Sequence, residues 1–155
     1  MLELAVLSAA FAMGAAIPDR YACGPHSPPL SWSEVPAGTQ SIAVLCDDSD
    51  APVGDWVHWV VFNLAPDVRD LPENVARDAA LPGGAVQGVN DYDRRGYDGP
   101  CPPPGRPHHY HFKVFALDAR LALDASARKA DLMQAMRGHV LAQGDLVGTY
   151  ARRAR

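Results

Sequence analysis

Apolar residues occur along this chain in short runs separated by polar turns. The runs Ser41–Cys46 and Trp56–Leu64 are apolar at nearly every position, which is typical of central strands covered on both faces. A third run, His108–Leu117, and a shorter one, Asp145–Tyr150, also have the composition of strands. This pattern predicts a mainly β fold of the sandwich type.

Alternation assigns faces to these strands, because successive side chains of a strand point to opposite sides. In the second run it predicts a face formed by Trp56, His58, Val60 and Phe62. In the third run it predicts a face formed by His108, Tyr110, Phe112, Val114 and Ala116. Both strands are therefore expected to carry a histidine near their first residue.

Two segments carry helix signals. Asp70, followed by a leucine, a proline and a glutamate, resembles an N-cap with proline in the first turn, which predicts a short helix that ends before Pro82. A second helix is expected from about residue 127 to residue 143, with Ser126 or Asp124 as its cap and the next glycine as its stop. Its apolar stripe would consist of Leu132, Met136, His139 and Val140.

The first part of the chain favours extended structure. Residues 4–16 are apolar and superficially resemble the core of a signal peptide, but only Glu3 and no basic residue stands before them. The run is too short for a membrane span, so we expect a first strand with a loop. Prolines and glycines in residues 17–39 exclude a helix there. Without a linker or repeat, residues 1–155 are expected to form a single domain.

Charge and cysteine content narrow the classes of function. The formal net charge of −4 over 155 residues argues against a nucleic-acid binder, so any anion site must be local. Three cysteines without a CxxC motif suggest neither a disulfide framework nor a zinc knuckle, and a reducing cytoplasm fits best. A single Cys23–Cys101 or Cys46–Cys101 bond is left open.

Polar side chains gather where the apolar runs begin and end. Three aspartates follow the first run, and His58 lies just inside the second. Further on, a loop rich in glycine and proline leads directly into His108 and Tyr110. We expect these two regions to meet and to form a small pocket that accepts an anion.

Four motifs resemble the phosphatidylethanolamine-binding protein family, in its prokaryotic Raf-kinase-inhibitor-like branch. They are SPPLSW (27–32), DSDAP with WVHWVVFN (48–52 and 56–63), GYDGPCPP with HHYHF (96–103 and 108–112), and GHVLAQGDLVGTY (138–150). Their order and spacing cover nearly the whole chain. The resemblance implies a large antiparallel sheet packed on a smaller one, with one or two peripheral helices, and a binding protein without a cofactor or a metal rather than an enzyme.

The resemblance also implies which residues form the ligand pocket. The expected ligand-binding residues are Asp48, His58, Gly99, Pro100, His108 and Tyr110, and the expected supporting residues are Asp50, Pro52, Trp56 and Cys101. The implied ligand is a phosphate-type anion, such as a phospholipid headgroup, a nucleotide or a phosphorylated side chain. The family pattern further implies a cis bond before Pro52, although Ser49 and His109 depart from the usual proline and arginine.

Elementary chemistry suggests how such a pocket would work. His58 and His108 would donate hydrogen bonds to phosphate oxygens, joined by the Tyr110 hydroxyl and the Gly99 backbone N–H. Asp48 would repel the anion unless it pairs with an imidazole or takes up a proton. Binding of phosphate or sulfate is therefore expected to strengthen as pH falls through the histidine range, near about 6.5.

The same residues allow other classes of function. His109 and His111 share a strand face and could hold a metal ion with a carboxylate. A hydrolase is disfavoured because no GxSxG or HExxH motif occurs. The main alternative is a modulator that contacts a kinase or protease through the pocket. A homodimer is left open, and no integral membrane association is expected.

Overall fold

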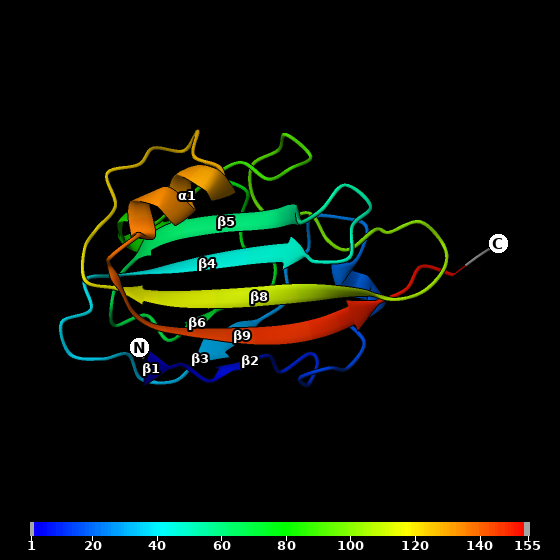
Figure 1. Cartoon of the computed structure of the whole chain (residues 1–155), viewed down its shortest axis with the longest axis horizontal. Coiled ribbons are helices and arrows are strands. Elements are labelled where there is room, and N and C mark those ends of the chain that lie inside the picture. The colour runs from blue at the N-terminus through cyan, green and yellow to red at the C-terminus, as the bar shows by residue number, and fades with distance from the viewer. Residues whose placement is uncertain (1, 154–155) are drawn as a thin grey trace.

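The fold, seen in a computed structural model that describes residues 2–153, consists of nine strands, one α-helix and two 3₁₀ turns (Figure 1). The strands are β1 (Leu2–Glu3), β2 (Val6–Leu7), β3 (Leu30–Trp32), β4 (Ser41–Asp48), β5 (Trp56–Leu64), β6 (Asp70–Leu71), β7 (Val86–Gln87), β8 (His108–Leu117) and β9 (Val140–Tyr150). The helix α1 spans Lys129–Met136, and the 3₁₀ turns span Asp19–Tyr21 and Pro82–Gly84. The mainly β class expected from the sequence is confirmed.

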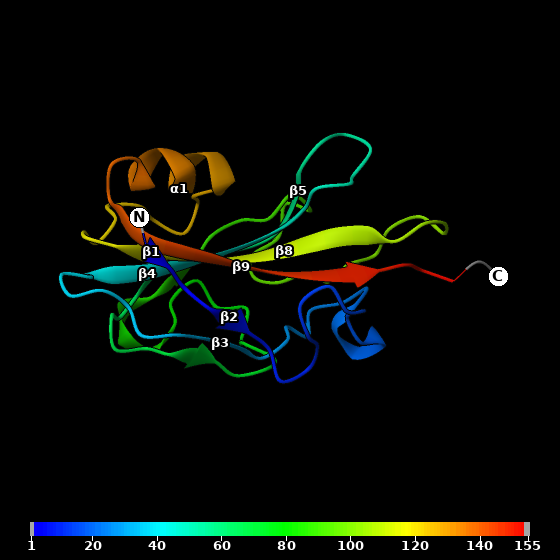
Figure 2. The same cartoon turned by 60° about the horizontal axis from the view of Figure 1, so that its bottom comes forward.

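The strands form two sheets of different size. The large sheet has six strands in the order β1-β9-β8-β4-β5-β7, and the small sheet has the order β2-β3-β6. All pairings are antiparallel except that of β1 with β9. Figure 2 shows the small sheet on one face of the large sheet and α1 on the other. The large sheet is therefore the middle layer, and the predicted pairing of a large with a smaller sheet is confirmed.

The central strands are buried on both faces, as their continuous apolar runs predict. Ile42 and Val44 of β4 pack in the core toward the small sheet, whereas Ala43 and Leu45 pack in the core beneath α1. All four side chains are inaccessible to solvent. Burial of each large apolar side chain contributes about 1.5–3 kcal/mol to folding, so these two cores fix the position of β4.

The predicted alternation along β5 holds for Trp56 and His58 but is wrong for Val60 and Phe62, because the strand contains a bulge at His58. In the pairing of β4 with β5, Cys46 lies opposite Trp59 and Asp47 opposite Val57, so His58 has no partner of its own. Such an extra residue reverses the order of the faces that follow it. Val57 and Val60 therefore both lie in the core beneath α1. His58 is released from the ladder and turns toward the pocket described below.

The helix predicted after Asp70 is absent, and residues 70–71 form β6 instead. The backbone groups that a helix would pair internally are bound by distant side chains. Gln87 Nε2 donates to the carbonyls of Ala76 and Asp78 at 2.6 and 2.9 Å, and the Ser27 hydroxyl accepts the Val75 N–H at 2.9 Å. The segment therefore stays extended despite its local helix signals.

The second predicted helix is real but shorter than expected. α1 ends at Met136, because Gly138 adopts a left-handed φ of +80° and the chain then enters β9. Neither proposed cap is used: the Arg128 N–H at the helix start is bound by Asp131 at 2.9 Å. His139, expected on a helical core stripe, lies between α1 and β9 and is half exposed, with its Nδ1 2.7 Å from Asp118.

Residues 4–16, expected to form a first strand with a loop, contain the short strand β2, and β1 lies just before them. The following segment covers the edge of β9, where the Gly14 and Ile17 N–H groups donate to the carbonyls of Val147 and Thr149 at 2.7 Å. Among the residues that the structure describes, none of the helices has the length and apolar character that crossing a membrane requires.

Replacing Gln87 with leucine is expected to lower the free energy of unfolding by about 2 kcal/mol. The substitution keeps the size of the buried side chain but leaves three groups without their partner, the Trp59 indole N–H and the carbonyls of Ala76 and Asp78. Urea unfolding followed by tryptophan fluorescence measures the change. The matched control is Gln40→Leu, an exposed position where we expect a change below about 0.5 kcal/mol. Equal stabilities of the two variants would contradict the assignment.

Candidate functional site

A hollow of about 230 Å³ opens at the end of the large sheet where β4 finishes and β5 and β8 begin. Four of the predicted ligand-binding residues line it together: Asp48, His58, His108 and Tyr110. The remaining lining residues are Ala51, Pro52, Val53, Trp56, Tyr92, Cys101, Pro102 and Pro103. The pocket therefore joins a small polar floor to a largely apolar rim.

The strand register explains why these distant residues meet. Asp48 is the last residue of β4 and is paired with Trp56 on one side and with Tyr110 on the other. Residues directly opposite one another in antiparallel strands place their side chains on the same face. His58 follows two residues after Trp56 and so lies on this face too, and β4, β5 and β8 all contribute to one cluster.

Both oxygens of the Asp48 carboxylate are occupied within the protein. Oδ2 lies 2.7 Å from His108 Nδ1, and Oδ1 accepts the N–H of Asp50 at 2.8 Å. The residue is almost completely buried. Because the carboxylate accepts the Nδ1 proton of His108, the Nε2 atom of that ring is left for a ligand.

His58 is held by a backbone carbonyl rather than by an acid. Its Nδ1 lies 2.6 Å from the carbonyl oxygen of Asp98, and only 2% of its surface is exposed. A carbonyl oxygen only accepts, so Nδ1 carries the proton. Burial lowers the pKa of His58, although the bond to Asp98 opposes this effect. Near neutral pH the ring is therefore neutral, and its Nε2 becomes a donor only after it takes up a proton.

Tyr110 supplies the hydroxyl group of the site. Burial raises the pKa of Tyr110, and the neighbouring Asp48 carboxylate raises it further. The phenol therefore keeps its O–H at any physiological pH. The ring packs edge-on against His58, with centroids 5.3 Å apart, which limits the movement of both side chains.

Gly99 and Pro100, also expected to bind the ligand, do not line this hollow. The Gly99 N–H donates to the Gly24 carbonyl at 2.8 Å, so it is not free for an anion. A Cβ at Gly99 would lie 2.1 Å from the Tyr21 carbonyl oxygen, which explains the need for glycine. The two residues hold the pocket wall from behind, while Cys101 and the prolines after it form its surface.

A disulfide joins Cys23 to Cys101, which decides between the two pairings that the sequence left open. Cys46 is free and buried, and burial raises the pKa of its thiol. The disulfide attaches the pocket wall to the 3₁₀ turn region around Tyr21. It also weighs against the expected cytoplasmic location, because cytoplasmic thiols are generally kept reduced.

The turn that carries Pro52 differs from the expected one. No cis peptide bond occurs within residues 2–153, so the predicted cis bond before Pro52 is wrong. The turn is closed instead by Gly54, whose N–H donates to the Ala51 carbonyl at 3.0 Å with φ at +96°. Asp50 supports the turn by accepting the His109 backbone N–H at 2.7 Å, and a hydrogen bond from the His109 side chain lowers the pKa of Asp50.

Two further residues organise the wall that carries Tyr92: Asn90, and Asp98 of the GYDGPCPP motif, and neither was expected to have a role in the site. Asn90 is fully buried; its Nδ2 donates to the Asp98 carboxylate at 2.8 Å, and its Oδ1 accepts the Tyr92 N–H at 2.9 Å. Asp98 also accepts from Arg77 at 2.9 Å. Since the Asp98 carbonyl orients His58, this network connects the wall to the floor of the pocket.

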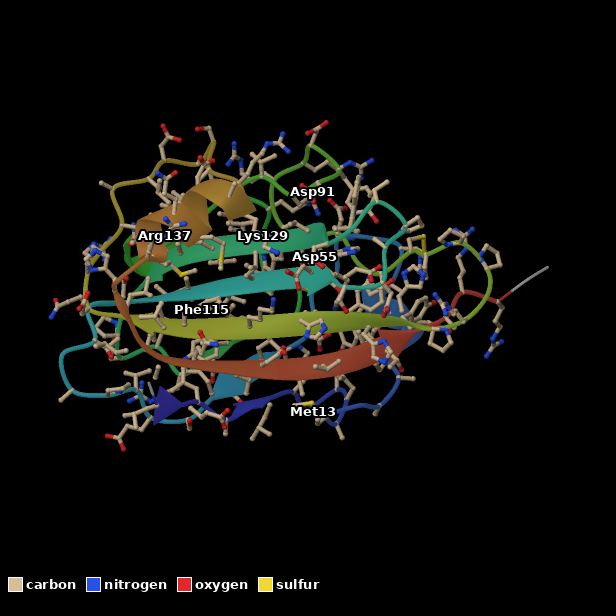
Figure 3. The ribbon with its side chains drawn as sticks, viewed as in Figure 1. Met13, Asp55, Asp91, Phe115, Lys129 and Arg137 are labelled. Carbon is tan, nitrogen blue, oxygen red and sulfur yellow. A yellow bond between two sulfur atoms is a disulfide. The ribbon has the colours of Figure 1, made fainter. Side chains whose placement is uncertain are left out.

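Asp47, next to Asp48 on β4, points to the face of the large sheet that α1 covers, and it forms an ion pair there instead of lining the pocket. Asp47 is 1% exposed and accepts from Lys129 at 2.8 Å. Lys129, at the start of α1, also reaches Asp55 in the pocket loop at 3.4 Å, and Figure 3 shows the two side chains on the same side of the sheet. Burial would lower the pKa of Lys129, but the bond to Asp47 outweighs it and raises that pKa. α1 thus braces the loop that carries the pocket rim.

The histidines weighed as metal ligands are bound to separate carboxylates. His109 Nδ1 lies 2.7 Å from Asp50, and His111 Nδ1 lies 2.8 Å from Asp145. Across residues 2–153, no group of three His, Cys, Asp or Glu side chains is placed to hold a metal ion. These two histidines are therefore bound to different acids.

Comparison with known proteins gives matches over the whole fold. A family described as "Phosphatidylethanolamine-binding protein" matches residues 7–151. A "UPF0098 protein" of Methanothermobacter thermautotrophicus is 51% identical over 88% of this chain and 91% of its own length. A "UPF0098 protein" of Aquifex aeolicus is 42% identical over 95% of this chain and 88% of its own length.

Two crystal structures superpose closely on this fold. YbcL of E. coli, described as a new member of the mammalian PEBP family, has a TM-score of 0.91 and 36% identity, covering 97% of this chain and 99% of its own. CT736 of Chlamydia trachomatis, described as a PEBP homolog, has a TM-score of 0.88 and 38% identity; the match covers 98% of this chain and 99% of CT736.

Proposed function

Because the chain belongs to the phosphatidylethanolamine-binding protein family, we propose that it is a non-enzymatic binding protein whose pocket takes a phosphate-type anion. The observation that carries the proposal is the grouping of two imidazole Nε2 atoms and one phenolic O–H in a hollow of about 230 Å³. A phosphate group fits this volume, and the apolar rim would accept the organic part of the molecule.

Proton uptake is the step that makes the site an anion site. An imidazole whose single proton is on Nδ1 presents Nε2 only as an acceptor, so the Tyr110 hydroxyl is the donor that faces an anion, while the Asp48 carboxylate opposes it. An anion that binds to His58 Nε2 favours the protonated ring and so raises the pKa that burial lowers. Binding is therefore coupled to the uptake of protons, and affinity must rise as pH falls.

Sulfate is expected to bind about tenfold more tightly at about pH 5.5 than at about pH 7.5. The pH range over which the affinity rises begins near the ordinary histidine pKa and extends to lower pH, because burial lowers the pKa of His58 in the free protein. Isothermal titration calorimetry in buffers of different ionisation enthalpy measures both the affinity and the protons taken up. Sulfate is the better probe here because phosphate itself titrates in this range.

Two variants give this experiment its control. His58→Gln is expected to weaken sulfate binding about tenfold and to flatten its pH dependence. His139→Gln removes a histidine that is half exposed and bound to Asp118, and it should leave both unchanged. Binding that does not vary with pH in the unmodified protein, or a pH dependence that survives in His58→Gln, would refute the proposed site.

The source of the phosphate group is a separate question with the same chemistry. Phosphoethanolamine, a nucleoside monophosphate and a phosphoserine peptide each present a phosphate that the floor would bind alike, and they differ only in what meets the rim. Competition of each against sulfate would rank them. The kinase or protease partner stays a prediction, and the homodimer stays open.

A further inference from the structure

A second hollow, of about 170 Å³, adjoins the proposed phosphate pocket. It is lined by Cys23, Gly24, Tyr92, Arg94, Asp98, Gly99 and Cys101. Two of these residues, Tyr92 and Cys101, also line the first pocket. The two hollows therefore meet at Tyr92 and Cys101, and a single elongated molecule that passes over these two residues could occupy both.

The second hollow contains a positive charge that is only partly neutralised. The Asp98 carboxylate accepts from Arg77 Nη2 at 2.9 Å and from Asn90 Nδ2 at 2.8 Å, whereas Arg94 Nη1 lies 3.6 Å away. One carboxylate charge is thus shared by two guanidinium groups, and Arg77 has the closer contact. The Arg94 side chain is 68% exposed, so a surplus positive charge stands at the mouth of this hollow.

The backbone beneath Arg94 is held firmly in place. Its N–H donates to Asn90 Oδ1 at 3.2 Å, and its carbonyl accepts the Asn90 N–H at 2.8 Å. Asn90 is fully buried. A guanidinium on a fixed backbone loses less conformational entropy when it binds a ligand than one on a mobile loop.

We propose that this second hollow is a subsite for a second anionic group of the ligand, with Arg94 as the residue that recognises it. The proposal rests on the proposed phosphate pocket. Guanidinium binds carboxylate and phosphate oxygens through two parallel hydrogen bonds, which suits a terminal carboxylate or a second phosphate. The ligand class is therefore an elongated molecule with a phosphate group at one end, an apolar link that crosses Tyr92 and Cys101, and an anionic group at the other end.

A series of phosphonates tests this assignment by calorimetry at constant ionic strength. Hexylphosphonate offers the phosphate-like group and the link alone, and phosphonoacetate, phosphonobutanoate and phosphonohexanoate add a carboxylate at increasing distance. In the unmodified protein, at least one of the carboxylates should bind roughly threefold to tenfold more tightly than hexylphosphonate. In Arg94→Gln this preference should fall to about one, with the affinity for hexylphosphonate unchanged, and Arg94→Lys should keep part of it.

Two matched charge variants separate Arg94 from the general field near the pocket. Arg106→Gln removes an exposed charge from the loop before β8, and Arg152→Gln removes one whose Nη1 lies 3.6 Å from Cys101 Sγ. Both should keep the preference. Loss of the preference in either of them but not in Arg94→Gln would overturn the assignment, as would equal binding of all four phosphonates in the unmodified protein. If no phosphonate binds at all, the proposed phosphate pocket itself fails, and the subsite with it.

Discussion

Replacing Cys101 with serine is expected to lower the free energy of unfolding by about 4 kcal/mol. The disulfide to Cys23 closes a loop across a sequence separation of 78 residues, and a crosslink of this span removes much of the conformational freedom of the unfolded chain. The folded structure should change little apart from the pocket wall. Guanidinium unfolding of the oxidised protein and of the variant gives the difference.

Reduction provides the control for this prediction. Unmodified protein treated with dithiothreitol should lose about the same stability as the variant, and Cys23→Ser/Cys101→Ser should not respond to dithiothreitol at all. Cys46 is buried and unpaired, so it takes no part in this difference. An unfolding midpoint that is the same for oxidised and fully reduced protein would show that the crosslink contributes nothing to stability.

Replacing Asp98 with asparagine is expected to cost about 3 kcal/mol of folding free energy and to weaken sulfate binding about tenfold. Its carboxylate is 10% exposed, and one oxygen, Oδ2, accepts from both Arg77 and Asn90. An amide oxygen can take that place, but the amide lacks the negative charge that pairs with Arg77, and its NH₂ group would face the Arg94 guanidinium. Breaking a buried ion pair usually costs about 3–5 kcal/mol. We expect the lower end of this range because Arg77 is 34% exposed and can be partly rehydrated. Sulfate affinity should fall because the Asp98 carbonyl, which orients His58, would shift with its loop.

The same loop offers a matched substitution. Asp93 forms an ion pair with Arg128 at 2.6 Å, but its side chain is 78% exposed. Asp93→Asn should therefore change stability by less than about 0.5 kcal/mol and leave sulfate binding intact. Thermal unfolding and calorimetry on both variants distinguish the buried from the exposed carboxylate. A loss in Asp93→Asn as large as that in Asp98→Asn would refute the special role of Asp98.

The sequence predicted those elements of the fold that depend on the residues of one short segment. β4, β5 and β8 appear in the sequence as apolar runs, because a strand covered on both faces must be apolar at consecutive positions. The helix expected after Asp70 failed because its caps and proline are local signals, whereas Gln87 and Ser27 capture its backbone from elsewhere in the chain. The end of α1 was misplaced for a simpler reason, since either Gly138 or Gly144 could have served as the stop.

Some residues of the candidate site could likewise be predicted from the sequence, and others could not. The residue types of the pocket floor could be named from motifs that resemble a known family, and the structure brings Asp48, His58, His108 and Tyr110 together. The role expected of Gly99 could not be tested by spacing alone, because its N–H is bound by Gly24, far away in sequence. Tyr92 and Asp98 were missed because nothing in the pattern of a polar loop says which of its members are buried.

By itself, the sequence determined the β class, the three long central strands and the groups available for chemistry, because these depend on which residues are present and on their immediate neighbours. Only the tertiary structure decided that His58 sits on a bulge and is neutral in the empty pocket, that Cys23 pairs with Cys101, and that Arg94 stands beside a second hollow. Burial and hydrogen-bond partners set these properties, and the partners come from segments that are distant in sequence and meet only when the sheets are packed.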